Sequence, residues 1–181
     1  MTETKTLIRF FTIADFEEEE AWLREQHNMG WRLAKATLPC FYTFDRCEPE
    51  DVIYRLDFKN GEEEGDYFQM FRDYGWEYFE HMAGWLYFRK PAAEVETEAD
   101  GELFSDGLSK VEMVKKIVFT RLLPLLTIFL CCLLPSWLRR FDGGIFSVLS
   151  YVLYALVLLY IWLIVYCGIK LTKLRKKYEK E

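Results

Sequence analysis

The chain has 181 residues, of which 51% are hydrophobic and 18% aromatic, and this composition excludes an intrinsically disordered protein. Residues 1–109 carry 11 basic and 25 acidic side chains, whereas residues 110–181 carry 12 basic and 4 acidic side chains. Because binding to a phosphate backbone requires a basic surface, we expect no nucleic-acid partner for the acidic first half. At roughly 150 residues per domain, the length allows one domain and an appendage.

The first predicted elements are a strand-like run at Ile8–Phe11 and a helix from Asp15 to Met29. Asp15 is a suitable N-cap residue, and Glu18 three residues later fits a capping box. The acidic run Glu17–Glu20 then lies at the positive end of the helix dipole. A metal-binding or acid–base role for these four carboxylates is the alternative, but the helix start accounts for them fully.

The same order of elements then occurs a second time. Gly30-Trp31 ends the first helix, and Gly75-Trp76 ends a second helix at Glu62–Tyr74, 45 residues later. Strands are predicted from Trp31 and at Phe41–Arg46, Ile53–Phe58, Trp76–Met82 and Trp85–Lys90, so that each helix follows one strand and precedes two. This spacing predicts an internal duplication of a β-α-β-β unit. It also predicts that Trp31 and Trp76 are equivalent, so that alanine at either position costs a similar 3–5 kcal/mol.

Six strands and two helices in the order βαβββαββ predict an α+β fold for residues 1–91. We expect a two-layer sandwich, with one antiparallel sheet and both helices on one of its faces. In the last hairpin, aromatic residues occupy both odd- and even-numbered positions, and these positions point to opposite faces of the sheet. Something must therefore cover part of the second sheet face. A second copy of the chain, a partner protein, a ligand or the membrane surface could do so. The predicted interaction surface is Trp76, Tyr78, Trp85 and Tyr87.

Residues 92–109 follow as an acidic segment with few large apolar side chains, which is typical of a flexible linker. Residues 110–169 then contain two long apolar runs, at about 117–138 and 145–169. Each is long enough to cross a bilayer, which takes roughly 20 residues as a helix. Two buried helices of a soluble protein are the alternative, but these would need a large domain to cover them. The short connection Arg139–Gly144 predicts a two-helix transmembrane hairpin.

The basic residues beside the two predicted spans set their orientation. Nine lie on the side of the termini and two, Arg139 and Arg140, lie in the connection, so the positive-inside rule places both termini and the tail 170–181 in the cytoplasm. The tail could contact anionic lipids or the acidic domain of its own chain. The predicted membrane-surface contacts are Arg121, Lys170, Lys173, Arg175, Lys176 and Lys177.

No motif for chemistry stands out in the sequence. Neither His27 nor His81 has a Cys or His at a metal-ligand spacing, and Cys40 and Cys47 form no CxxC pair. The five cysteines are predicted to be free thiols in a reducing compartment. The glycines at 61 and 65 lie in an acidic run that would repel phosphate. We therefore expect no catalytic residue, cofactor or metal.

Several motifs together resemble a bacterial family, domain of unknown function 2812 (DUF2812). They are Trp22-Leu23, Gly30-Trp31-Arg32-Leu33, Tyr42-Thr43-Phe44, Tyr54-Arg55-Leu56-Asp57-Phe58, Tyr74-Gly75-Trp76-Glu77 and Tyr87-Phe88-Arg89-Lys90. The likeness covers roughly residues 5–90, and the two spans suit the membrane-attached members. The resemblance implies no reaction and no catalytic residue. Its members often stand beside PadR-type transcriptional regulators, which implies an envelope or drug-response setting.

The sequence therefore favours a non-enzymatic sensor or adaptor in the cell membrane, with a cytoplasmic domain that binds a partner. Its expected partners are the lipid bilayer and either another protein or further copies of this chain, through the sheet face or the spans. An accessory subunit of a membrane transporter, docked through the hairpin, is the second hypothesis. An enzyme acting on lipids or small molecules is the third.

Overall fold

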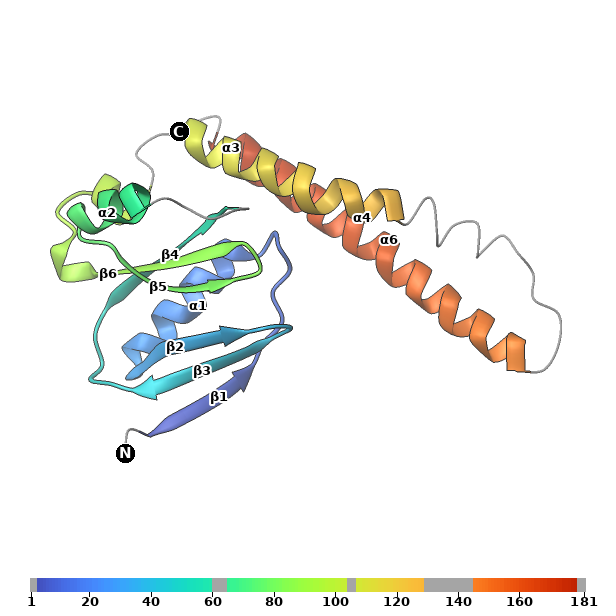
Figure 1. Ribbon diagram of the computed structural model, residues 1–181, viewed down its shortest axis with the longest axis horizontal. Coiled ribbons are helices and arrows are strands. Elements are labelled where there is room, and N and C mark those ends of the chain that lie inside the picture. Colours follow the sequence, from blue (N-terminus) through green and yellow to red (C-terminus); the bar gives the residue numbers. More distant parts are fainter. Residues whose placement is uncertain (1–2, 60–64, 104–106, 129–144, 179–181) are drawn as a thin grey trace. The chain divides into compact units, whose positions relative to one another are not determined.

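The computed structural model describes residues 3–59, 65–103, 107–128 and 145–178 (Figure 1). The chain divides into two compact units, residues 1–109 and 110–181, and each is described by itself. The connection Arg139–Gly144 and residues 129–138 of the first predicted span lie outside the described residues.

The first unit has the predicted order of elements. Its first half consists of β1 (Thr4–Ile8), α1 (Phe16–Asn28), β2 (Trp31–Thr37) and β3 (Phe41–Arg46). Its second half consists of β4 (Val52–Phe58), α2 (Gly65–Asp73), β5 (Glu77–Met82) and β6 (Trp85–Pro91). The α+β class and the order βαβββαββ are thus confirmed.

The strands form two three-stranded antiparallel sheets, and the predicted single sheet is wrong. Sheet A has the order β1-β3-β2, and sheet B has the order β4-β6-β5. Strands β2 and β5 contact each other, but a side chain takes up a backbone donor of β2. The carboxylate of Glu80 in β5 accepts a hydrogen bond from the backbone N–H of Ala36 at 3.2 Å. This bond uses an amide that continuous strand pairing would need.

The two halves match in local detail as well as in strand order. Gly30 and Gly75 both adopt positive φ, 82° and 83°, and each donates its N–H to the carbonyl three residues earlier. A bulge then interrupts β2 between Leu33 and Lys35 and β5 between Tyr78 and Glu80, at the same offset from the glycine. A side chain at Gly30 would also collide with the carbonyl oxygen of Cys47, 2.9 Å away.

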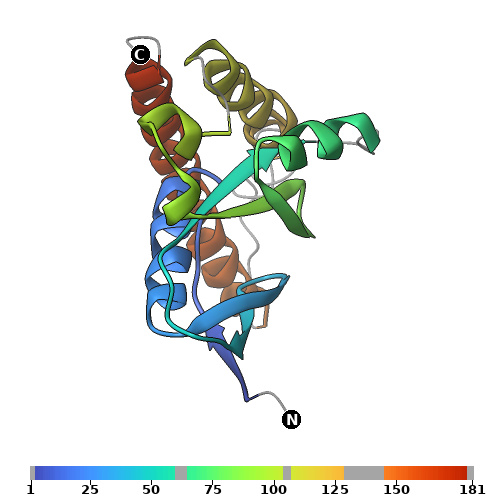
Figure 2. The same cartoon turned by 90° about the vertical axis from the view of Figure 1, so that its left-hand side faces the viewer.

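Helix α1 packs against both sheets (Figures 1 and 2). Trp22 makes edge-to-face contacts with Tyr42 and Phe44 of sheet A, with ring centroids 5.1 and 5.6 Å apart. Phe16 packs on Trp85 of sheet B at 5.3 Å. Asp15 stands at the N-cap position but forms no side-chain cap bond with α1, and its carboxylate accepts hydrogen bonds from Thr12 instead.

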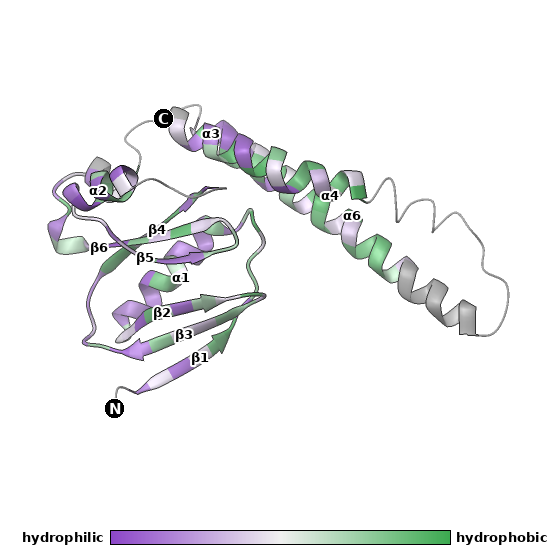
Figure 3. Cartoon of the chain, in the orientation of Figure 1, coloured by the Kyte–Doolittle hydropathy of each residue, from purple (hydrophilic) through white to green (hydrophobic). Residues whose placement is uncertain are grey.

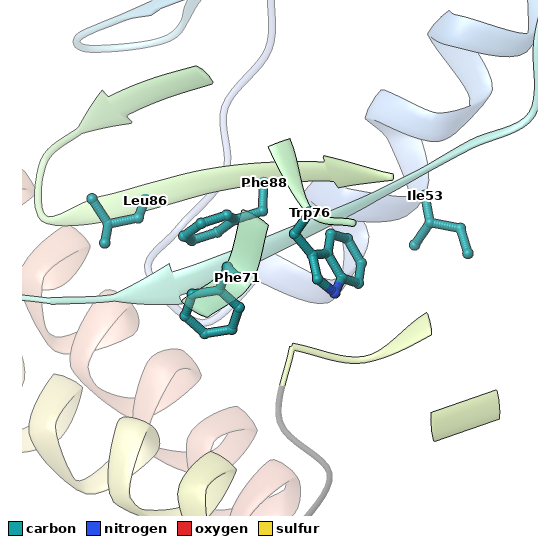
Figure 4. Close-up of a cluster of buried hydrophobic side chains, with 5 residues drawn as sticks. All are labelled: Ile53, Phe71, Trp76, Leu86 and Phe88. Carbon is teal, nitrogen blue, oxygen red and sulfur yellow. The ribbon is translucent and has the colours of Figure 1, made fainter. Parts of the chain in front are cut away.

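Helix α2 covers the other face of sheet B. Phe71 of α2 packs on Phe88 at 4.9 Å, within a buried cluster of Ile53, Phe71, Trp76, Leu86 and Phe88 (Figure 4). Neighbouring residues of β6 point to opposite faces, so Trp85 and Tyr87 meet α1 while Leu86 and Phe88 meet α2. The prediction that both helices lie on one sheet face is therefore wrong.

Residues 92–103, predicted as a linker, pack on the same cluster. They include two short 3₁₀ turns, η1 (Ala92–Glu94) and η2 (Glu98–Gly101). Ala92, Val95 and Leu103 contact the cluster, and Glu102 forms a 2.8 Å ion pair with Arg55 of β4. Small apolar side chains spaced among the acidic ones provide this contact, so the segment adds to the domain through residue 103.

The second unit is helical. It contains most of α3 (Gly107–Ile117), a π-helical turn η3 (Val118–Leu122), α4 (Leu123–Ile128) and the long α6 (Ile145–Tyr178). Helix α6 contacts η3, and Lys110 of α3 lies 5.1 Å from the ring of Tyr178. One segment among the described residues, Tyr154–Tyr178, is long and apolar enough to span a membrane, and its most apolar 18-residue window has a mean hydropathy of 2.0 (Figure 3). The described residues thus contain one candidate span, whereas the sequence predicts two.

Candidate functional site

The acidic start of α1 points partly into the core rather than wholly into water. Glu19 is 5% exposed, and its Oε1 accepts hydrogen bonds from the hydroxyls of Tyr42 at 2.9 Å and Tyr87 at 2.7 Å. Burial raises the pKa of Glu19, and the two tyrosine hydroxyls oppose that shift. Because Tyr42 belongs to sheet A and Tyr87 to sheet B, this carboxylate connects the two halves.

Glu20 closes the outer edge of sheet B. Its Oε1 accepts the backbone N–H of Leu56 at 2.8 Å, and Arg55 lies 3.4 Å from Oε2. Burial raises the pKa of Glu20 to about 8, against the opposing effect of the Arg55 charge. Sequence reasoning missed both carboxylates, although the spacing of Phe16, Glu19, Leu23 and Gln26 marks one helix face.

A pocket of about 220 Å³ lies where the two halves meet. The C-terminal end of α1, strands β2, β4, β5 and β6, and the β3–β4 connection all contribute to its wall. Its lining is mostly charged or polar: His27, Arg32, Cys47, Glu48, Glu50, Val52, Glu77, Arg89 and Pro91. A second depression, of about 420 Å³, is lined by α2 and the adjacent Tyr74 alone and joins no other element.

Two hydrogen-bonded pairs fix side chains of the pocket wall. The His27 Nδ1 and Tyr54 hydroxyl are 2.8 Å apart, and Arg89 binds Glu77 through two bonds of 2.7 Å. Burial, together with the charges of Arg89 and Arg32, lowers the pKa of His27 to about 4, so its imidazole is neutral at pH 7. Burial raises the pKa of Tyr54 to about 12, so this group keeps its proton.

The predicted interaction surface is largely interior. Trp76, Trp85 and Tyr87 are 3%, 6% and 0% exposed, because α1 and α2 cover the two faces of sheet B. Tyr78 is 39% exposed and packs on Phe68 of α2 at 4.5 Å. The chain's own helices thus cover the aromatic side chains on both faces of the last hairpin. Neither a second copy nor a ligand is needed to cover them.

Large apolar side chains are exposed elsewhere, at one end of sheet A. Ile8, Phe10, Leu38 and Phe41 are 68%, 77%, 61% and 40% exposed. Ile8 and Phe41 are paired across β1 and β3, and Leu38 lies in the β2–β3 turn beside them. We call these four residues the apolar end of sheet A.

The predicted membrane-surface residues lie in the second unit. Arg121 is exposed within η3, and Lys170, Lys173, Arg175, Lys176 and Lys177 lie in the last turns of α6. Trp162 and Tyr166 stack at 5.4 Å on the exposed side of α6. None of these residues belongs to the pocket or to the apolar end.

The other residues singled out in the sequence lie apart from one another. His81 is exposed in β5, Cys40 is buried, and Cys47 borders the pocket. Among the described residues, no group of three or more His, Cys, Asp or Glu side chains could hold a metal ion.

The sequence model of one family, described as protein of unknown function (DUF2812), matches residues 15–129. The match begins at the N-cap of α1 and extends into the helices of the second unit, further than the motifs in residues 5–90 indicate. No curated protein and no solved structure matches the chain.

Proposed function

We propose that this chain, which belongs to the DUF2812 family of proteins of unknown function, is a membrane-attached adaptor or sensor that binds a partner protein and is not an enzyme. The apolar end of sheet A carries this proposal. Contiguous exposed apolar groups on a soluble unit mark sites of protein or membrane interaction. Trp76, Trp85 and Tyr87 are buried beneath the two helices, whereas Ile8, Phe10, Leu38 and Phe41 are exposed together at this end.

The membrane attachment in this proposal consists of two spans with both termini in the cytoplasm. The 18-residue apolar window within Tyr154–Tyr178 and the excess of basic residues beside the termini support it. In this arrangement Arg121 and the basic residues at the end of α6 contact lipid headgroups. A reporter active only outside the cytoplasm should be silent after Glu181 and active at Gly143, and the reverse pattern would contradict the orientation.

We also attribute the two halves of the first unit to an internal duplication. The shared strand order, the positive-φ glycines and the bulges at one offset support it. A duplicated unit provides two similar sheets, and among the described residues the group of four exposed apolar side chains lies at an end of sheet A. The binding function is therefore assigned to the first half.

A pull-down in mild detergent with matched variants tests partner binding. The full-length chain should recover a stoichiometric partner, and Phe10→Ser with Leu38→Ser should lose it. Tyr74→Ser, which alters a 70% exposed aromatic outside the apolar end, is the control and should retain the partner. Loss of the partner from both variants, or from neither, would contradict the assignment of binding to the apolar end.

The identity of the partner separates this proposal from its alternative. A soluble regulator would support the adaptor or sensor. A stoichiometric permease that remains bound to the Phe10/Leu38 variant would instead support an accessory subunit of a transporter, docked through its helices. The exposed apolar side of α6, with Leu158, Trp162 and Ile169, favours that alternative.

A further inference from the structure

The pocket between the two halves has a lining of mixed charge. Arg32 and Arg89 supply two positive charges, and Glu48, Glu50 and Glu77 supply three negative charges. His27 is neutral, for the reasons given above. Arg89 and Glu77 pair with each other, so the charges left for a ligand are those of Arg32, Glu48 and Glu50. A simple anion would meet the two remaining carboxylates, and a simple cation would meet the Arg32 guanidinium group. A small molecule that carries both signs of charge matches this lining best.

The pocket is built before any ligand enters it. Arg89 is 13% exposed and held by Glu77 through two hydrogen bonds, and His27 is 5% exposed and held by Tyr54. If Tyr54 donates to Nδ1, the neutral imidazole carries its proton on Nε2 and can donate one bond to a ligand. Side chains fixed in this way lose little freedom on binding.

Arg32 differs from these fixed groups. Its side chain is exposed on β2, and it forms no hydrogen bond or ion pair within the described part of the chain. It lines the pocket together with His27 and Glu77. A guanidinium in this position is suited to bind a carboxylate through two parallel bonds.

The size of the pocket limits the ligand further. Its volume of about 220 Å³ is below the roughly 300–1,000 Å³ that drug-sized ligands occupy. This space fits a molecule of a few non-hydrogen atoms. Nucleotides and lipids are too large to be enclosed in it.

We propose that this pocket binds a free α-amino acid, with Arg32 recognising its carboxylate and the rim residues Glu48 and Glu50 recognising its ammonium group. The site shares no residue with the apolar end of sheet A, and it goes beyond the proposed partner binding. The two proposals can therefore fail separately. Loss of the partner in the pull-down would not contradict ligand binding in the pocket, and absence of a ligand would not contradict partner binding.

Calorimetric titration of the full-length chain in detergent tests the site. The probes are the common amino acids one by one, together with acetate and methylammonium as the two halves of the zwitterion. At least one amino acid should bind, at least tenfold more tightly than either half. Absence of binding by every amino acid at millimolar concentration would overturn the proposal, as would acetate binding as tightly as the best amino acid.

Variants separate recognition of the two charges. Arg32→Gln should weaken amino-acid binding at least tenfold, whereas Lys35→Gln, at an exposed position of the same strand outside the pocket, should leave it unchanged. Glu48→Gln with Glu50→Gln should weaken amino-acid binding and leave acetate binding unchanged or tighter. Equal effects of the two β2 variants would show that binding does not take place in this pocket.

Discussion

The two halves of the first unit share one strand order, yet their helices differ in what they join. Helix α1 has 13 residues, contacts both sheets and buries the polar side chains Glu19, Gln26 and His27. Helix α2 has nine residues, buries Phe71 and covers only sheet B. A repeated topology therefore does not impose repeated packing. One helix serves as the shared core of both halves, and the other closes a single face.

The largest test of this difference is a pair of tryptophans at equivalent positions. Trp76 is 3% exposed in the cluster under α2, so Trp76→Ala should cost about 3–5 kcal/mol of unfolding free energy. Trp31 is only half-buried and lies between Lys5 and Arg46, at 4.3 and 4.9 Å, so Trp31→Ala should cost about 1–2 kcal/mol.

Urea unfolding of the full-length chain in detergent measures both losses. Equal losses would restore the equivalence that the 45-residue spacing predicts from sequence. In the structure Trp76 is buried under α2 and Trp31 is only half-buried, which is why unequal losses are expected.

A double-mutant cycle tests whether α1 couples the two sheets. Tyr42→Phe and Tyr87→Phe each remove a hydrogen bond to the buried Glu19 carboxylate, at about 1–3 kcal/mol apiece. Because both hydroxyls donate to one oxygen, the two losses should be non-additive by about 0.5–3 kcal/mol. Tyr42→Phe combined with Tyr78→Phe, whose ring lies on the α2 side of sheet B, is the control and should be additive.

The pH dependence of stability should distinguish Glu19 and Glu20 of α1 from the exposed Glu18. The folded chain raises the pKa of Glu20 to about 8 from an ordinary value near 4.5, so its stabilising effect is full below pH 4.5 and is lost as pH rises to 8. His27, with its pKa lowered to about 4, acts in the opposite direction below pH 6.5. Stability should therefore fall between pH 6.5 and 8.

Glu20→Gln should flatten this fall, since glutamine keeps an oxygen for the Leu56 N–H and carries no charge. Glu18→Gln, at an exposed position of the same turn, should leave the slope as it is. If the Glu20→Gln variant still loses stability between pH 6.5 and 8, groups other than Glu20 cause the loss. Glu19 would then be the first of these groups to test.

The order of elements could be predicted from the sequence because its signals are local. Gly30 and Gly75 end their helices at positive φ as predicted, and Ala83-Gly84 forms the tight turn of the last hairpin. The division into two sheets could not be predicted in this way. It involves contacts between distant residues, such as Glu80 bonding to Ala36.

The site was harder to predict than the fold. Four consecutive glutamates are well explained by a helix start, so Glu19 and Glu20 gave no sign of burial from composition alone. The pocket combines His27, Arg32 and Arg89 from three separate elements, and no motif links them in sequence. The aromatic residues of the last hairpin did indicate a covered second face, but the cover is α2.

The hydrogen bond between Glu19 and Tyr87 has a consequence for the order of synthesis. These residues are 68 positions apart, and at roughly 5–20 residues per second a ribosome needs about 3–14 seconds to proceed from one to the other. During that interval the first half can pair β1, β2 and β3, but Glu19 lacks one of its two donors and α1 lacks sheet B. The nascent first half is thus an incomplete folding unit, and a chain truncated before β6 should be a substrate for chaperones and proteases.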